Sequence, residues 1–279
     1  MELTHKDVLN MLPERKLESH KGDYGRILLL CGSRGYTGAA ALAAMGALRT
    51  GAGLVYLGVP ESIYEIEAVK LTEPIVFPLP EKNGMLSVKA VDGIMELLPK
   101  MDAVLIGCGM GCSEDTFCVV QTILKEYTGT VILDADGINV LSGHIDILRG
   151  RTGTTILTPH VVEFQRIGGV LTEDRLESAK RFADLSNSII LLKGHRTVIT
   201  DGNCYYINPT GNPGMSVGGS GDVLAGIITA LVGQGLGPLD AAACGAWIHG
   251  AAGDFCAEEI GQYGMLPSDM LEVLPRLLK

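Results

Sequence analysis

The stretch with the clearest chemical potential in this sequence is a glycine-rich loop that ends in an aspartate. It runs from Asn208 to Asp222, is rich in Gly, Asn and Pro, and is followed at once by an apolar run at helical spacing, 223–232. The pattern predicts a loop that opens into a helix. Unpaired N–H groups of the first turn, the positive end of the helix dipole and closely approaching glycine backbone would together cradle phosphate oxygens.

Asp222 closes this loop, and its negative charge would repel a phosphate bound there. A carboxylate in that position can act as a general base that takes a proton from a substrate hydroxyl, while the glycine-rich turn stabilises the developing charge. It can equally cap the helix that follows. Spacing alone leaves both interpretations open.

The loop does not match two common nucleotide-binding motifs. The sequence has no Gly-x-x-x-x-Gly-Lys-Ser/Thr phosphate loop, and Gly214 and Gly218 do not complete a Gly-x-Gly-x-x-Gly fingerprint after a strand. Binding of phosphate here would therefore use a different architecture.

The elements that must position this loop alternate between strand and helix. Apolar runs typical of buried strands fall at 26–31, 54–59, 103–106, 130–134, 155–158, 188–192, 198–200 and 204–207. Predicted helices fall at 39–50, 87–98, 115–127, 162–167, 172–185, 223–232, 240–257 and 268–278. This alternation predicts one layered α/β domain over residues 1–279 with a mostly parallel sheet.

Several segments with chemical potential follow strands of this sheet and so share its carboxyl edge, where open α/β folds bind ligands. They are the glycine loops 32–38 and 107–111, the pair Asp134 and Asp136, and His160. The glycines could instead serve only tight packing of strand against helix. For the two aspartates we favour capping of the next turn over a water-mediated contact with magnesium.

Lys193 and Arg196 are rare positive charges that follow the predicted strand 188–192. They are natural partners for nucleotide phosphates, although a basic hairpin turn is commonly just solvated. His249 lies among small apolar residues, so we expect it to be a packed core histidine.

Composition excludes several classes of function. The formal net charge of −10 disfavours binding to nucleic acid or an acidic membrane, and no apolar run is long enough to span a bilayer. The first residues lack a signal-peptide core, and the seven cysteines are scattered, as in a reducing compartment. We therefore expect a cytoplasmic protein with free cysteines; a zinc site built from Cys108, Cys112 and Cys118 is disfavoured.

Taken together, these motifs resemble one family across nearly the whole chain. They are Ser19-His20-Lys21-Gly22, Thr158-Pro159-His160 with Glu163-Phe164, Lys193-Gly194, Asn208-x-Thr210-Gly211-Asn212 and Gly218-Gly219-Ser220-Gly221-Asp222. The combination is similar to the ADP-dependent NAD(P)H-hydrate dehydratases of the ribokinase-like superfamily. The resemblance implies a three-layer α/β/α fold with a mostly parallel central sheet, without the epimerase domain that some members carry in front.

The resemblance also implies a reaction. Hydrated NADH or NADPH carries a hydroxyl on its reduced nicotinamide ring; ADP, or ATP, would phosphorylate that hydroxyl, and elimination of phosphate would restore the ring and, from ADP, yield AMP. Magnesium would be held mainly by phosphates and water, so no protein ligand is assigned to it. We further expect a homotetramer that works with an NAD(P)H-hydrate epimerase without a stable complex.

The family's functional positions can be carried over residue by residue. Asp222 would be the base, with the backbone of Gly219 and Gly221 stabilising the transferred phosphoryl group. The nucleotide-binding positions would be Lys193, Gly194, His195, Arg196, Thr197 and Gly221. The positions for the hydrated cofactor would be Ala39, Ala40, Gly109, His160 and Asp222.

Two departures from the family pattern stand out. Ser220 replaces the usual Thr, which keeps the hydroxyl, and Val161-Val162 replaces the usual Pro-Gly after His160, which puts the local loop shape in doubt. The nearest rival function is a small-molecule kinase of the same superfamily, acting on a vitamin precursor. A nucleotide sensor without catalysis would be expected to have lost Asp222 or the glycine turn, and both are intact.

Overall fold

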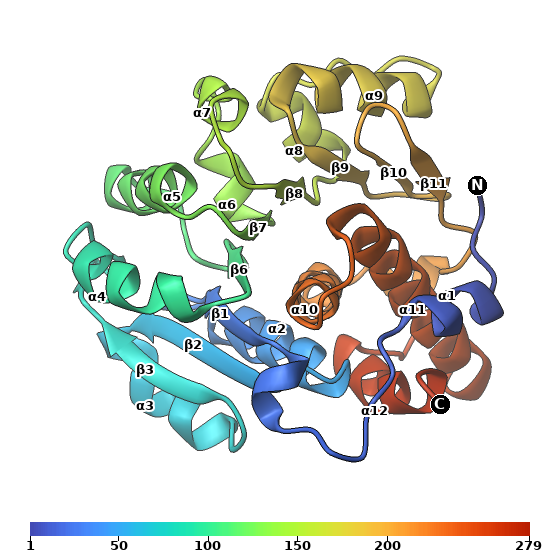
Figure 1. Ribbon diagram of the computed structural model, residues 1–279, viewed down its shortest axis with the longest axis horizontal. Coiled ribbons are helices and arrows are strands. Elements are labelled where there is room, and N and C mark those ends of the chain that lie inside the picture. Colours follow the sequence, from blue (N-terminus) through green and yellow to red (C-terminus); the bar gives the residue numbers. More distant parts are fainter.

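The computed structural model describes residues 1–279 and shows a nine-stranded sheet between two layers of helices (Figure 1). The strand order is β11-β10-β9-β8-β7-β6-β1-β2-β3, and only β10 runs antiparallel to its neighbours. The predicted mostly parallel sheet is confirmed. Its strands are β1 (Arg26–Leu30), β2 (Leu54–Pro60), β3 (Ile75–Leu79), β6 (Ala103–Ile106), β7 (Thr130–Leu133), β8 (Thr155–Leu157), β9 (Ile189–Leu192), β10 (Val198–Thr200) and β11 (Tyr205–Ile207).

Each face of the sheet is covered by its own apolar core. Alternate residues of β1 divide between the two: Ile27 and Leu29 pack into one, Leu28 and Leu30 into the other. The first core is closed by α1 (His5–Met11), α2 (Thr37–Arg49), α3 (Glu61–Lys70), α10 (Ser220–Gly233), α11 (Pro238–Glu259) and α12 (Pro267–Leu277). The second is closed by α4 (Ala90–Leu97), α5 (Glu114–Glu126), α6 (Asp136–Asn139), α7 (Asp146–Arg149), α8 (Val161–Arg166) and α9 (Arg175–Ser186).

Sequence patterns did not reveal the helices α1 and α3, the strand β3 or the small hairpin of β4 (Glu81–Lys82) and β5 (Met85–Leu86). β3 escaped because it is an edge strand with a mixed burial pattern that contains Pro78, a residue that argues against a central strand. β4 and β5 have two residues each, too few to show a period.

Both outer edges of the sheet are obstructed. β3 carries Pro78, which has no backbone N–H to offer a further strand. At the other edge, the N–H of Ile207 in β11 donates to the carbonyl oxygen of Met1 over 3.0 Å, and the amino group of Met1 donates to the carbonyl oxygen of Tyr205. No helix of the structure has the length and apolar character needed to cross a membrane.

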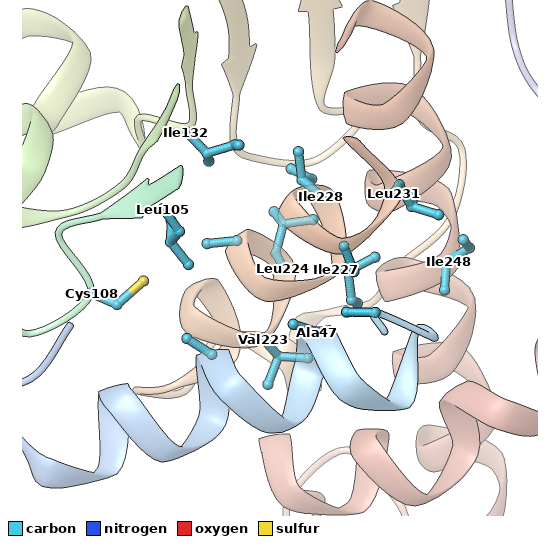
Figure 2. Packing of buried hydrophobic residues seen from close by; sticks show 14 of the residues in the cluster. Ala47, Leu105, Cys108, Ile132, Val223, Leu224, Ile227, Ile228, Leu231 and Ile248 are labelled. Carbon is cyan, nitrogen blue, oxygen red and sulfur yellow. The ribbon is translucent and has the colours of Figure 1, made fainter. Parts of the chain in front are cut away.

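The helices α2 and α10 lie in unusually close contact beside the central strands (Figures 1 and 2). A Cβ atom at Gly46 would stand 2.8 Å from the carbonyl oxygen of Val223, and one at Gly226 would collide with the carbonyl oxygen of Ala43. Val223, Leu224 and Ile227 complete the packing of α10 between α2 and the sheet (Figure 2). The first turn of α10 is therefore held rigidly at the carboxyl edge of the sheet.

We predict that Gly226→Ala destabilises the protein by about 1–3 kcal/mol, because the new methyl group meets backbone that cannot move aside. The matched control is Gly93→Ala in α4, where a Cβ would meet only Leu79 at an ordinary 3.8 Å. That change should be neutral or stabilising, since Ala is the better helix former. Urea unfolding of both variants measures the difference; equal midpoints would contradict this account of the α2–α10 contact.

Candidate active site

The site forms where the ends of β6, β7 and β9 meet the start of α10. Cys108 follows β6, Asp134 follows β7 and Lys193 follows β9, while Asp222 lies in the first turn of α10. Side-chain ligand atoms of Cys108, Asp134 and Asp222 all lie within 4.8 Å of one another. The Nζ of Lys193 lies 2.8 Å from Oδ1 of Asp134. Four groups from distant parts of the chain thus lie close together at the carboxyl edge of the sheet.

The start of α10 has the features of an anion cradle. Gly219 is the N-cap residue with a φ of 99°, a conformation that favours glycine, and no side chain caps the helix. The backbone N–H groups of Gly219, Gly221 and Asp222 donate to no group of the protein. The alternative in which Asp222 merely caps its helix is therefore wrong, since its carboxylate is turned to the neighbouring strand ends instead.

Asp222 has the ionisation behaviour expected of a general base. Burial raises the pKa of its carboxyl to about 6, and the nearby charge of Asp134 adds to that rise, against opposing effects of Cys108 and Lys193. A base whose pKa lies near neutrality combines sufficient proton affinity with an ionised form at the working pH. The side chain is neither exposed nor fully buried, so a substrate can reach it.

Lys193 lies at the end of β9, and a Cβ placed on Gly221 would be 3.5 Å from its Nζ. Its ammonium bonds to Asp134 and lies 3.8 Å from Oε2 of Glu163. Burial disfavours the charge, but the carboxylates of Asp134 and Glu163 outweigh it and raise the pKa of Lys193. The result is a fixed cation beside the glycine turn, not the solvated turn residue considered as an alternative.

The expectation that Asp134 and Asp136 cap the next turn is wrong. Oδ1 of Asp134 accepts hydrogen bonds from Thr158 (2.6 Å) and Lys193, whereas Asp136 accepts the backbone N–H of Gly111 at 2.8 Å. The N-cap of α6 is Ala135, with no capping side chain. Both carboxylates are used to tie neighbouring strand ends together, which sequence spacing could not show.

The positions assigned to the hydrated cofactor separate into two groups. A Cβ on Gly109 would stand 2.8 Å from the methyl group of Ala39 and 2.9 Å from Cβ of Tyr36, so the first glycine loop and the start of α2 adjoin. Ala40 is fully buried and its methyl group packs against Gly32, which leaves its side chain unable to touch a ligand.

His160 is exposed at the N-cap of α8. Its Nδ1 accepts the backbone N–H groups of Val162 and Glu163 at 3.1 and 3.3 Å. These bonds hold the ring at the start of the helix even though Val161-Val162 stands where the family pattern has Pro-Gly.

The predicted nucleotide segment 193–197 is a tight loop between β9 and β10. Thr197 closes it, because its Oγ1 accepts from the N–H of Gly194 and donates to the carbonyl oxygen of the same residue. His195 and Arg196 are exposed, and Arg196 forms an ion pair with Glu2. The structure thus brings Lys193 to Gly221 and Asp222, while Arg196 points to the N-terminal segment.

The expectation that His249 is a packed core residue is confirmed, but one contact was missed. His249 is 8% exposed, and its Nε2 lies 3.2 Å from Oγ of Ser220 in the glycine turn. Burial lowers the pKa of His249 to about 4, so the ring is neutral. The signal available in the sequence was the hydroxyl at position 220, which needs a buried partner.

A match to a family model settles what kind of protein this is. The model described as NAD(P)H-hydrate dehydratase matches residues 27–276. The chain belongs to the NAD(P)H-hydrate dehydratase family. The family predicted from the motifs is therefore confirmed, as is the ribokinase-like fold.

Relatives of this family agree with that placement. The bifunctional NAD(P)H-hydrate repair enzyme of Moorella thermoacetica is 46% identical over 97% of this chain, and that of Thermofilum pendens 37% over 96%. The chain spans about half the length of these curated relatives, 52% in both cases.

Solved structures show the same fold. The ADP/ATP-dependent NAD(P)H-hydrate dehydratase of Bacillus subtilis, co-crystallised with ATP and Mg²⁺, is 32% identical with a TM-score of 0.83, covering 98% of this chain and 96% of that one. A ribokinase-like superfamily protein of Enterococcus faecalis has a TM-score of 0.86 at 26% identity, covering 99% and 94%. A hydroxyethylthiazole kinase of Pyrococcus horikoshii shares the fold alone, with 17% identity and a TM-score of 0.59.

We predict that Asp222→Asn stabilises the folded protein above pH 6. The folded state holds a proton on Asp222 up to about pH 6, whereas the unfolded chain releases it near 3.8, so ionisation of this group lowers stability as pH rises through that window. Removing the charge should add about 1–2 kcal/mol at pH 7.5, after allowance for partial exposure, and nothing at pH 3.5.

Urea unfolding of the wild type and the variant at both pH values measures this effect. Asp92→Asn, which removes an exposed carboxylate on α4, is the control and should show no such pH-dependent gain. A variant that is less stable than the wild type at pH 7.5 would show that Asp222 is stabilised as an anion in the fold.

Proposed function

We propose that this chain catalyses the nucleotide-dependent dehydration of hydrated NADH and NADPH. The observation that carries the proposal is the carboxyl of Asp222, with its raised pKa, at the free N–H groups of the α10 N-terminus. A base and an anion cradle on adjacent backbone are what transfer of a phosphoryl group to an alcohol requires. Membership of the dehydratase family supports the choice of substrate.

The first step joins the ring hydroxyl to the terminal phosphoryl group of ADP or ATP. Asp222 takes the hydroxyl proton as the oxygen attacks phosphorus, and the bond from phosphorus to the leaving nucleotide oxygen breaks. The N–H groups of Gly219 and Gly221 would meet the equatorial oxygens, and Lys193 would balance their charge. The products of this step are a phosphate ester and, from ADP, AMP.

The second step removes the phosphate. The carbon–oxygen bond breaks with the electron pair leaving on phosphate, and a proton lost from the ring restores the double bond. Hydroxide is a poor leaving group and phosphate a good one. The role of the nucleotide is therefore to convert the ring hydroxyl into a phosphate ester, which can leave. The net change converts the hydrate and ADP into NAD(P)H, AMP and phosphate.

Magnesium would screen the charge of the nucleotide phosphates during transfer. Oδ1 of Asp134 already accepts two hydrogen bonds, and the oxygens of Asp136 bond to Gly111, Cys112 and Asn139. These occupied carboxylates fit an ion held chiefly by phosphates and water, as expected.

The binding residues form part of the same proposal. The nucleotide would be held by Lys193, Gly194, His195, Arg196, Thr197 and Gly221. The hydrated cofactor would be faced by Ala39, Gly109, His160 and Asp222, while the buried Ala40 would support the loop that carries Ala39. We further propose a cytoplasmic homotetramer whose substrate is equilibrated by an epimerase activity. The curated relatives, which are named as bifunctional, support the pairing with a second activity.

The experiment mixes the protein with hydrated NADH, magnesium and ADP or ATP and follows the return of dihydronicotinamide absorbance. We expect recovery with at least one nucleotide and release of one phosphate per cofactor restored. A kinase would instead accumulate a stable phosphorylated product, detectable by mass spectrometry. If absorbance does not return with either nucleotide, the proposed dehydratase activity is ruled out.

We predict that Asp222→Asn lowers turnover about 10²- to 10⁴-fold, the usual contribution of a general base. Nucleotide affinity, measured by calorimetry, should change little, because the N–H groups and Lys193 remain. Arg196→Ala is the comparison within the nucleotide segment and should affect KM for the nucleotide more than kcat. Full turnover in Asp222→Asn would place the base elsewhere.

A further inference from the structure

One buried group at the site has no part in the proposed reaction. Cys108 lies two residues after the end of β6 and has no exposed surface. Its Sγ donates toward Oδ2 of Asp134 over 3.7 Å and shares the 4.8 Å cluster with the carboxylate of Asp222. In Figure 2 its sulfur points toward the first turn of α10. A neutral hydrogen-bond donor thus lies close to two carboxylates.

We propose that Cys108 is a positioning residue that holds the carboxylate of Asp222 ionised and directed at the substrate hydroxyl, through a thiol hydrogen that bonds Asp134 in this structure and lies within reach of Asp222. The proposal rests on the proposed function in that it names Asp222 as the base. It adds a residue that acts through this base and never meets the substrate.

The need for such a donor follows from the charges. Two carboxylates this close repel each other, and only one opposing cation, Lys193, is bonded to the pair, through Asp134. A thiol has one hydrogen to donate, so a thiol within reach of both carboxylates can stabilise either anion without adding a charge. The hydrogen bond from Cys108 lowers the pKa of Asp222, in opposition to the effects of burial and Asp134.

The thiol is suited to this task because it keeps its proton. A hydrogen bond with the Cys31 thiol, burial and the neighbouring carboxylates hold the pKa of Cys108 well above its ordinary value. Cys31 is also buried and follows β1 directly. Cys108 therefore remains a donor throughout the pH range in which Asp222 titrates.

Other ionisable groups face Asp222 from the elements packed around it. Asp134 and Asp136 come from the segment after β7, and Lys193 from the end of β9. His249 of α11 is neutral and bonds to Ser220, which lies two residues before Asp222. Of these groups, only Asp134 loses a hydrogen bond when Cys108 is replaced, so a change in the titration of Asp222 reports the thiol acting directly or through Asp134.

The test measures the titration of Asp222 directly. Aspartate labelled with ¹³C at the carboxyl carbon is incorporated, and the Asp222 signal is assigned by its loss in Asp222→Asn. Wild type, Cys108→Ala, Cys108→Ser and Cys256→Ala are compared; the last removes a buried thiol on α11 that is not among the groups around Asp222, and it controls for the loss of a buried thiol as such. Thermal unfolding confirms that each variant is folded.

We expect Cys108→Ala to raise the titration midpoint of Asp222 by about 0.5–1 pH unit, since a hydrogen bond to the charged form is lost. Cys108→Ser should keep the midpoint at or below the wild-type value, and Cys256→Ala should leave it unchanged. A wild-type midpoint in Cys108→Ala, or the same rise in Cys108→Ser, would overturn the proposal. Should Cys108→Ala fail to fold, a rise in the serine variant alone decides against it and an unchanged or lower midpoint supports it.

The acidic limb of the kcat–pH profile measures the same ionisation through activity. If Asp222 is the base, this limb should move upward with the NMR midpoint in Cys108→Ala, with little change in KM. A protein without dehydratase activity in any variant would contradict the proposed function, while the NMR titration would still decide the role of Cys108.

Discussion

The close contact of α2 with α10 is the constraint on which the rest of this structure depends. Gly46 and Gly226 remove the side chains that would separate the two helices, so backbone meets backbone. Leu42 reaches Gly219 near one end, and Gln234 donates to the carbonyl oxygen of Thr50 near the other. A helix clamped along its length cannot withdraw its first turn, and the proposed chemistry takes place at that turn.

Clamping has a second effect, on electrostatics. Because α10 is fixed in place, the carboxylate of Asp222 is held close to that of Asp134. The repulsion between these two carboxylates is offset by Lys193 and the Cys108 thiol, both of which bond to Asp134. The pKa of Asp222 is raised first by burial and then by the charge of Asp134, which the packing of α10 keeps close. The ionised carboxylate of Asp222 lowers the stability of the folded protein but provides a base for the reaction, an example of the trade-off between stability and activity.

Sequence reasoning recovered the elements whose signals are local. Buried parallel strands give unbroken apolar runs, so the sequence places β1, β6 and β9 to within about one residue. The glycine turn likewise predicts that a helix begins near Asp222, where α10 begins. What it could not supply were contacts that depend on the fold. The partners of Asp134, namely Lys193 and Thr158, are remote in sequence, and a carboxylate after a strand looks the same whether it caps a turn or anchors a lysine. Sequence patterns likewise give Cys108 no role beyond a disfavoured zinc site.

The obstructed borders of the sheet bear on how copies of this chain can assemble. A strand added at β3 would meet Pro78, and one added at β11 would have to displace Met1. Growth of a continuous sheet from molecule to molecule is thereby discouraged, which protects a sheet made largely of aliphatic runs from aggregation. Any symmetric oligomer is left to join through its helical layers, where shape and charge can be specific.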